Sequence, residues 1–250
     1  MSRVGKAEFF RRPAGGNSSG RAARRAPVGR RPAARTAVAE LFPMFVKIAG
    51  RDCLVVGAGA IAESKIESLV RCGARVRVVA PRATEAVRRA AREGAIVWEE
   101  RPFRRSDLYG AWLVIAATSS PQLHERIFRL ARRAGILCNA VDEPERCDFY
   151  YPAVVRRGPL QIAVSTGGRA PSLAQRLRRE LEGQFAPEYG AWTEEIGRAR
   201  NAVLARSVAS TGAAGEERKR VLRKLSSARA FAAFRKRAKM RARLRNKRER

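Results

Sequence analysis

Residues 54–65 read LVVGAGAIAESK, and this stretch decides the fold. An apolar run leads into Gly57 and Gly59, and an amphipathic segment follows. The pattern G-x-G-x-x-[GA] at residues 57–62 is typical of a strand-to-helix turn that binds a dinucleotide's pyrophosphate. The first glycine makes the tight bend, the second lets backbone N–H groups approach phosphate, and Ala62 lets the helix pack closely on the strand. The alternative is a tight turn without a ligand.

The segments around this turn alternate between strand and helix. We expect strands at residues 44–48, 53–56, 75–81, 95–100, 112–118 and 136–142, and helices at 60–72, 84–93 and 121–134. The first of these strands would be a short edge strand, and each helix is followed by a glycine. Continuously apolar strands indicate a parallel sheet covered on both faces. The predicted fold class is therefore α/β, with a Rossmann-type parallel sheet and helices on both faces.

The pattern changes after residue 142. Residues 148–166 read as two strands joined by a basic turn at 156–159, and the sequence from Pro171 onward reads as helical. The predicted parts are a disordered basic extension at 1–40, the Rossmann domain at 41–150, a hairpin region at 151–170, a helical domain at 171–236 and a basic tail at 237–250.

The formal net charge of +30 is typical of a nucleic-acid-binding protein, but its distribution is not. Residues 1–43 hold ten Lys/Arg against two acids, and residues 206–250 hold seventeen against three. The remaining chain is only moderately basic, as expected for a domain that binds an anionic ligand. The C-terminal stretch has no interleaved aromatic residues, so we expect no specific nucleic-acid partner. A nucleic-acid or anionic-surface module is the alternative from another functional class.

The composition also bears on the compartment. Residues 1–40 superficially resemble an Arg-rich transit peptide, but we favour an extended or misassigned start, with Met44 as the true beginning. No apolar run approaches the ~20 residues that span a bilayer. The four cysteines form no CxxC pair. We therefore expect a cytoplasmic protein with reduced thiols and no membrane segment.

The end of the second strand bears on the identity of the cofactor. A conventional NAD site has Asp or Glu there to bind the ribose hydroxyls. Here the strand ends in VVAPRAT, with Glu85 as the nearest acid. Since Arg82 would favour a 2′-phosphate, the residues alone leave NAD and NADP both open.

Two further stretches carry candidate chemistry. Asp142 ends an apolar strand, so its carboxylate is a candidate general base or metal ligand at the carboxyl ends of the strands; the alternative is a simple turn. The loop at 165–169 (STGGR) precedes a helix that begins near Ser172, and its amides favour an anionic group; the alternative is a capping loop with Ser172 as N-cap. His124, the single histidine, is expected in a surface or packing role.

Taken together, these stretches resemble a known family. They are FPMFVKIAGRDCLVVGAGAIAESK, GARVRVVAP, LVIAATSSPQLHERI, LCNAVDEPERCDFYYPAVVRRGPLQIAVSTGGRAPSLAQRLRRELE and YGAW. Over residues 41–236 the chain is similar to the precorrin-2 dehydrogenase and sirohydrochlorin ferrochelatase family, which also forms the N-terminal region of siroheme synthases. The segment CDFYYPAVVRRGPLQIAVSTGG is more specific than the glycine turn.

The resemblance implies NAD-dependent oxidation of precorrin-2 to sirohydrochlorin, and in some members insertion of Fe²⁺ as a further substrate. It implies a homodimer that uses residues 151–170, with Asp142 as the key acid and as a transient metal ligand. The expected cofactor contacts are Gly57, Gly59, Ala60, Ile61, Pro81, Arg82 and Thr118. The expected contacts to the polycarboxylate substrate are Asn139, Arg156, Arg157, Ser165, Thr166, Gly167 and Arg169.

The sequence departs from the family at three positions, where Ala58, Ser64 and Ala170 replace a common Gly, Arg and Ser. The alternative within the same family is a stand-alone sirohydrochlorin chelatase that uses the Rossmann domain only as a scaffold. The intact glycine turn argues against that alternative.

Overall fold

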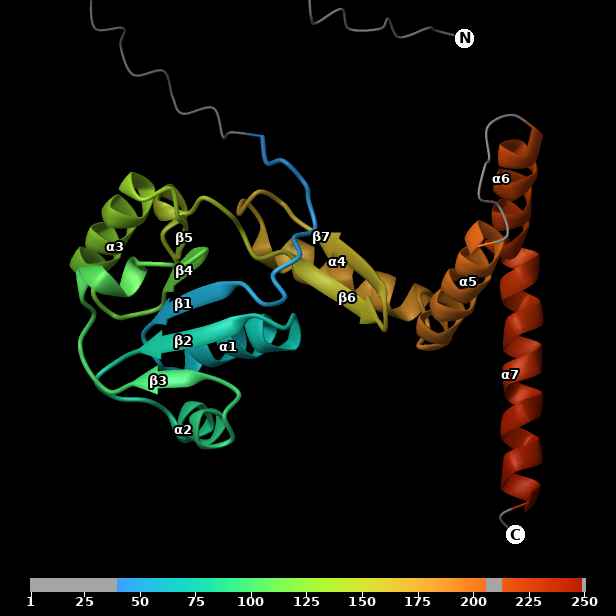
Figure 1. Cartoon of the computed structure of the whole chain (residues 1–250), viewed down its shortest axis with the longest axis horizontal. Helices are drawn as coiled ribbons and strands as arrows, with labels where there is room; N and C mark the ends of the chain where they lie inside the picture. The colour runs from blue at the N-terminus through green and yellow to red at the C-terminus, as the bar shows by residue number, and fades with distance from the viewer. Residues whose placement is uncertain (1–39, 206–212, 249–250) are drawn as a thin grey trace, which may run out of the picture. The chain divides into compact units, whose positions relative to one another are not determined.

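The computed structural model describes residues 40–205 and 213–248. Its N-terminal half contains a five-stranded parallel sheet of order β3-β2-β1-β4-β5 (Figure 1). The strands are β1 (Asp52–Val56), β2 (Arg75–Val79), β3 (Val97–Glu99), β4 (Leu113–Ala116) and β5 (Leu137–Ala140). This order confirms the predicted Rossmann-type sheet. The direction of winding reverses at β1, so a topological switch point lies between β1 and β4, where such sheets bind ligands.

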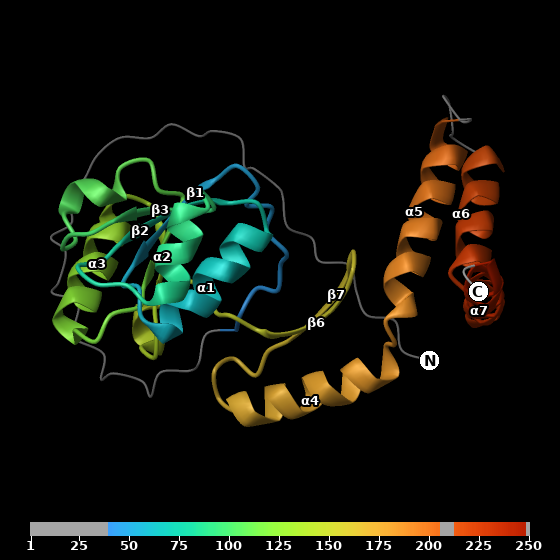
Figure 2. The same ribbon diagram turned by 90° about the horizontal axis from the view of Figure 1, so that it is seen from below.

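Helices cover both faces of the sheet, as predicted (Figure 2). They are α1 (Ala60–Arg71), α2 (Glu85–Arg92), α3 (Pro121–Arg133) and the 3₁₀ helix η1 (Arg105–Leu108). Val55 of β1 packs with residues of α1 and α2, whereas its neighbours Leu54 and Val56 pack with residues of α3 and η1. Successive side chains of β1 therefore enter two separate cores, which explains why Cys53–Val56 are all apolar and buried.

A buried ionic network fixes η1 to the sheet. Asp107 of η1 is only 2% exposed, and its carboxylate accepts a hydrogen bond from Arg101 Nη2 at 2.7 Å. Arg77 of β2 donates to the Asp107 carbonyl and also pairs with Glu99 at 3.2 Å, and Glu99 in turn pairs with Arg101. The pKa of Asp107 is lowered, because hydrogen bonds from Arg101 and from the Arg104 N–H outweigh the opposing effect of burial.

The C-terminal half begins with an antiparallel hairpin, as predicted. Its elements are β6 (Ala153–Arg157), β7 (Leu160–Val164), α4 (Pro171–Gln184), α5 (Glu188–Ala205), α6 (Ala213–Leu225) and α7 (Ala228–Arg248). At the hairpin turn, Gly158 takes φ +55°, and a Cβ on Gly190 of α5 would lie 3.0 Å from the Arg157 carbonyl. The first turn of α5 thus meets the hairpin through backbone rather than side chains.

Aromatic side chains join α5 to its neighbours. Tyr189 and Trp192 of α5 stack with Phe231 of α7 at ring-centroid distances of 4.1 and 4.7 Å, and Phe185 contacts Tyr189 at 5.2 Å. The half-buried Trp192 therefore packs against α7. α7 continues to Arg248, so the chain remains helical into the predicted basic tail.

Two details of the predicted elements are wrong or untested. Residues 44–48 form no strand, and the side chains of Phe42, Met44 and Phe45 are exposed. The outer edge of β5 is bordered by residues 147–149, since the Asp148 N–H donates to the Cys138 carbonyl at 2.7 Å. The predicted disorder of residues 1–40 falls almost entirely outside the described residues. No helix in the described ranges is long and apolar enough to cross a membrane.

Candidate cofactor and substrate site

The glycine turn lies at the switch point and contacts the loop after β4. Gly57 takes φ +104°, and its N–H donates to the Val79 carbonyl at 3.0 Å. A Cβ on Gly57 would lie 2.1 Å from the Ala117 carbonyl oxygen and 3.2 Å from the Thr118 methyl group. No side chain can be accommodated there, so the fold itself requires this glycine.

Gly59 is different, because the fold does not require it. It is the N-cap of α1 in extended conformation, with φ −83°, and a Cβ added there would meet nothing within 4 Å. The first N–H groups of an α-helix have no partner within the helix and carry its partial positive charge. The open space at Gly59 is therefore a cradle that fits an anionic group, and a dinucleotide pyrophosphate is such a group.

The other predicted cofactor residues lie in the first turn of α1 and in the loops after β2 and β4. Ala60 and Ile61 form the first turn of α1, and the Ile61 side chain is 56% exposed although it is aliphatic. Pro81 and Arg82 follow β2 and are exposed. Ala58 and Thr84 tie the two segments together, since the Thr84 N–H donates to the Ala58 carbonyl at 3.1 Å.

No acid directly follows β2 in the chain, although Glu99 of β3 is the strand partner of Val79 at the end of β2. Glu85, the nearest candidate, pairs with Arg92 at 2.5 Å along α2. Arg82 is thus the charged side chain that follows β2 most closely, as the sequence indicates.

Asp142 lies directly after β5, at the same edge of the sheet. The hydrogen bond from the Val141 N–H to the Ala116 carbonyl, 2.9 Å long, extends the β4–β5 pairing up to it. Asp142 is exposed, and at φ +64° it is the only non-glycine residue with left-handed backbone among those the structure describes. Such a conformation is uncommon and recurs at functional sites, although Asp tolerates it better than most residues.

Lys65 interacts electrostatically with Asp142, and sequence reasoning did not identify it. It is half-buried on α1, and its Nζ lies 4.1 Å from the centroid of the Tyr151 ring. Burial lowers the pKa of Lys65, whereas the Asp142 carboxylate acts in the opposite direction by attraction. Lys65 is the last residue of the stretch LVVGAGAIAESK. Its position in the sequence does not predict an interaction with Asp142, which follows β5.

His124 is buried, which confirms a packing rather than a surface role. It is 4% exposed on α3, and its Nε2 accepts a hydrogen bond from the Thr118 N–H at 3.1 Å. Its Nδ1 lies 2.8 Å from Glu143 Oε1. Sequence reasoning missed this second connection because Glu143 is remote in sequence and reaches His124 only through the packing of α3 against β5.

Some predicted substrate contacts are engaged within the chain. Asn139 Nδ2 donates to the Phe149 carbonyl at 2.8 Å, so it holds the segment beside β5. The Arg157 guanidinium donates to the carbonyls of Phe185 and Glu182 at 2.7 and 2.9 Å, so it closes the C-terminus of α4. Arg156 is half-buried on β6. Their role as substrate contacts stays a prediction.

The loop between β7 and α4 is closed by its own hydrogen bonds. The Gly167 N–H donates to Ser165 Oγ at 3.2 Å, and the Arg169 N–H donates to the Thr166 carbonyl at 3.1 Å. The Ala170 N–H donates to Thr166 Oγ1 at 3.1 Å. The amides of Gly167 and Arg169, which were expected to favour an anion, therefore have hydrogen-bond partners within the loop.

The same loop corrects one prediction and reveals one contact. Ala170 is the N-cap of α4 and Pro171 its first residue, so Ser172 as N-cap is wrong; proline suits that first position because it lacks an N–H. Gly168 lies against the Tyr150 ring, since a Cβ there would be 3.4 Å from it, and the Tyr150 hydroxyl donates to the Pro144 carbonyl at 3.2 Å. Tyr150 thus contacts both this loop and the segment that follows Asp142.

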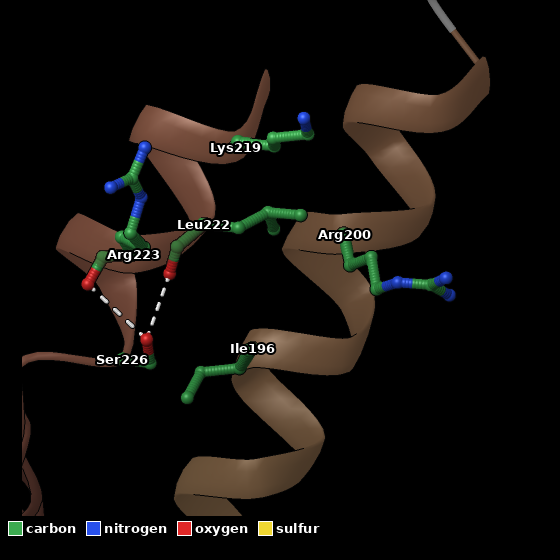
Figure 3. A pocket seen from close by; sticks show the side chains of 6 residues that line it. All are labelled: Ile196, Arg200, Lys219, Leu222, Arg223 and Ser226. Carbon is green, nitrogen blue, oxygen red and sulfur yellow. Dashed lines mark hydrogen bonds between the residues drawn. The ribbon is translucent and has the colours of Figure 1, made fainter. Parts of the chain in front are cut away.

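The described residues were also compared with two other kinds of site, a metal centre and a surface groove. Within residues 40–205 and 213–248, no group of three or more His, Cys, Asp or Glu side chains is placed to hold a metal. A groove of about 490 Å³ between α5 and α6 (Figure 3) contains none of the predicted site residues. It is lined by Ile196, Arg200, Lys219, Leu222, Arg223 and Ser226.

The strand order, the glycine turn and the open cradle define the class: this is a Rossmann-type dinucleotide-binding protein. Residues 44–153 match the family model for putative NAD(P)-binding, and residues 157–184 match the model for the sirohaem biosynthesis protein central region. The siroheme synthase of Neisseria meningitidis serogroup C (strain FAM18) is 43% identical over 162 residues, which is 65% of this chain and 34% of that protein. That of Nitrosococcus oceani is 38% identical over 167 residues, 67% of this chain and 36% of that protein.

These matches confirm the predicted relationship to siroheme synthases, with an NAD(P)-binding region at residues 44–153 followed by a sirohaem-biosynthesis central region at residues 157–184. It spans about a third of the length of the curated relatives it matches. The solved structure of "SirC, precorrin-2 dehydrogenase" aligns with a TM-score of 0.63 at 22% identity, over 75% of this chain and 90% of that one. That likeness confirms the fold.

Proposed function

We propose that this chain catalyses the NAD-dependent dehydrogenation of precorrin-2 to sirohydrochlorin in siroheme biosynthesis. The observation that carries the proposal is the open cradle at Gly59, which shares one edge of the sheet with Asp142. The choice of substrate is supported by the relationship to siroheme synthases and by the structural likeness to a precorrin-2 dehydrogenase.

The residues divide the work as follows. When bound, the nicotinamide ring accepts a hydride, and a proton leaves the substrate as the second product of dehydrogenation. The N-terminus of α1 and Gly59 bind the pyrophosphate. The exposed Asp142 carboxylate accepts the proton, and the half-buried Lys65 interacts electrostatically with that carboxylate.

NAD rather than NADP is the proposed cofactor, and the segment at Pro81 and Arg82 is where the choice is made. Both residues are exposed beside the cradle, where the adenosine ribose of a bound dinucleotide is expected. Arg82→Ala should leave the Kd for NAD⁺ within about threefold of its value in the unaltered protein. The same substitution should raise the Kd for NADP⁺ by more than that. NADP⁺ binding that exceeds NAD⁺ binding in the unaltered protein would contradict this part of the proposal.

The homodimer is proposed on the basis of the hairpin. A two-stranded sheet is only marginally stable alone, and both outer edges of β6 and β7 are open to pairing in the described sheet. A second copy that adds strands at these edges would complete it. Analytical ultracentrifugation should show a dimer, and a monomer at micromolar concentration would oppose the proposal.

The cytoplasm remains the predicted compartment, since the described cysteines are free thiols.

The test is turnover of precorrin-2 with NAD⁺, followed by NADH absorbance and by sirohydrochlorin formation. Asp142→Asn should retain NAD⁺ binding and lose about 100-fold or more in kcat, the usual contribution of a general base. Glu145→Gln, which alters an exposed acid three residues away, is the matched control and should keep full activity. Full activity of Asp142→Asn would remove Asp142 from the mechanism.

Addition of Fe²⁺ to the same assay tests the second proposed substrate. If iron is inserted, the exposed Asp142 carboxylate is its proposed transient ligand, and Asp142→Asn should lose siroheme formation from supplied sirohydrochlorin. Metal insertion without any NAD⁺ turnover would favour the chelatase alternative.

A further inference from the structure

One buried side chain connects two loops at the carboxyl edge of the sheet. His124 receives the Thr118 N–H at Nε2, at 3.1 Å, and contacts Glu143 Oε1 through Nδ1, at 2.8 Å. Thr118 belongs to the loop after β4 that lies against Gly57, and Glu143 directly follows Asp142. A single imidazole thus contacts both the loop beside the cofactor cradle and the loop that carries the proposed base.

The hydrogen bonds define one form of this imidazole. Because the Thr118 N–H is a donor, Nε2 must present its lone pair, and the ring proton therefore lies on Nδ1. That proton points at the Glu143 carboxylate, which is an acceptor. Only the neutral tautomer with its proton on Nδ1 satisfies both contacts.

The Glu143 carboxylate is itself fixed, so the connection is stiff. Arg146 donates to Glu143 Oε2 and also to Glu125 Oε2 of α3, the latter at 2.6 Å. The imidazole contacts Glu143, and through Glu143 it is linked to Arg146 and then to Glu125. Glu143 is held from two sides, by His124 and by Arg146, and the start of the loop after β5 is held with it.

We propose that His124 is a positioning residue, which sets the position of the Asp142 loop relative to the cofactor loop. A shift of either loop would require the imidazole to give up one of its two hydrogen bonds, and a buried donor or acceptor without a partner is costly. The part of this inference that concerns cofactor and turnover rests on the proposed function. The tautomer of His124 and the fixed positions of the two loops do not depend on the proposed function.

The rival explanation is that His124 merely fills space in the core, and two variants separate the two roles. In His124→Gln, the amide oxygen can still accept from the Thr118 N–H at about the place of Nε2. In His124→Leu, the volume is retained and both hydrogen bonds are lost. Ile127→Val, on the same helix and fully buried, is the control for a small loss of packing.

The first measurements need no cofactor. Since the chain has a single histidine, its ¹⁵N resonances report the tautomer of His124 alone, and we expect the form protonated at Nδ1. Exchange of the Thr118 amide hydrogen should be slow in the unaltered protein and in His124→Gln, and at least about 10-fold faster in His124→Leu. An imidazole protonated at Nε2, or equal Thr118 exchange in all variants, would overturn the inference.

Calorimetric titration with NAD⁺ and precorrin-2 turnover complete the test. His124→Leu should bind NAD⁺ about 10-fold more weakly and lose kcat, whereas His124→Gln and Ile127→Val should stay within about threefold in Kd. Unchanged NAD⁺ affinity and kcat in His124→Leu would overturn the positioning role. Failure of the unaltered protein to bind NAD⁺ would refute the proposed function instead, and the tautomer and exchange data would then decide the inference.

Discussion

The two glycines of the turn should respond in opposite ways to the same added methyl group. A Cβ at Gly57 would overlap the Ala117 carbonyl oxygen at 2.1 Å, on backbone with φ +104°, whereas a Cβ at Gly59 would meet no protein atom within 4 Å. Gly57→Ala is therefore expected to damage the fold. Gly59→Ala is expected to leave the fold intact and to occupy the space of the ligand.

The magnitudes follow from these geometries. The left-handed backbone costs an alanine roughly 1–3 kcal/mol, and relief of the overlap requires movement of the loop after β4, so Gly57→Ala should lose about 3 kcal/mol or more in the free energy of unfolding. For Gly59→Ala, the weaker helix cap is offset by the smaller entropy of the unfolded chain, which leaves a change within about 1 kcal/mol. Loss of one charge-assisted hydrogen bond to pyrophosphate, about 1.5–3 kcal/mol, weakens NAD⁺ binding roughly 10- to 100-fold.

The assay combines two measurements on three proteins. Urea unfolding gives the stability of the unaltered chain, Gly57→Ala and Gly59→Ala, and calorimetric titration gives the Kd for NAD⁺. Gly59→Ala with normal stability and normal NAD⁺ affinity would refute the placement of the pyrophosphate at this cradle. Equal destabilisation by both substitutions would refute the assignment of separate structural and ligand-binding roles.

Three other perturbations test the fold around the site. Asp107→Ala leaves the arginine partners of a nearly buried carboxylate without their counter-charge and should cost roughly 2 kcal/mol or more in urea unfolding; a change below about 0.5 kcal/mol would contradict a structural role for the network. Burial raises the pKa of the Cys138 thiol to about 12, whereas Cys72 is exposed, so iodoacetamide should label Cys72 in the native protein and Cys138 only after unfolding. Rapid native labelling of Cys138 would contradict the described core. Gly190→Leu should push α5 away from the Arg157 carbonyl and increase hydrogen exchange in the first turn of α5, and unchanged exchange there would speak against the glycine contact.

The sheet could be predicted from sequence because its signals are local. The central strands β1, β4 and β5 are mostly apolar runs, and each α-helix of the Rossmann part ends at a glycine, which in the structure takes positive φ at Gly73, Gly94 and Gly135. The false strand at 44–48 has the same apolar texture. The pattern of apolar residues alone cannot show that residues 147–149 border the outer edge of β5.

The site was only partly predictable, for the same reason. The glycine pattern and the position of Asp142 at a strand end are properties of the sequence. The roles of Lys65 and His124 depend on α1 and α3 packing beside the loop after β5, and their partners are far away in sequence. Arg157 is a further example, since its hydrogen bonds to the C-terminus of α4 could not be read from the sequence.

The most direct test of the proposed function is a single assay: purified protein, precorrin-2 and NAD⁺, with NADH and sirohydrochlorin measured together. We expect equal molar amounts of both products, and loss of both with Gly59→Ala or Asp142→Asn while each variant remains folded. Formation of sirohydrochlorin without NADH, or no product with either NAD⁺ or NADP⁺ from the folded protein, would contradict the proposal.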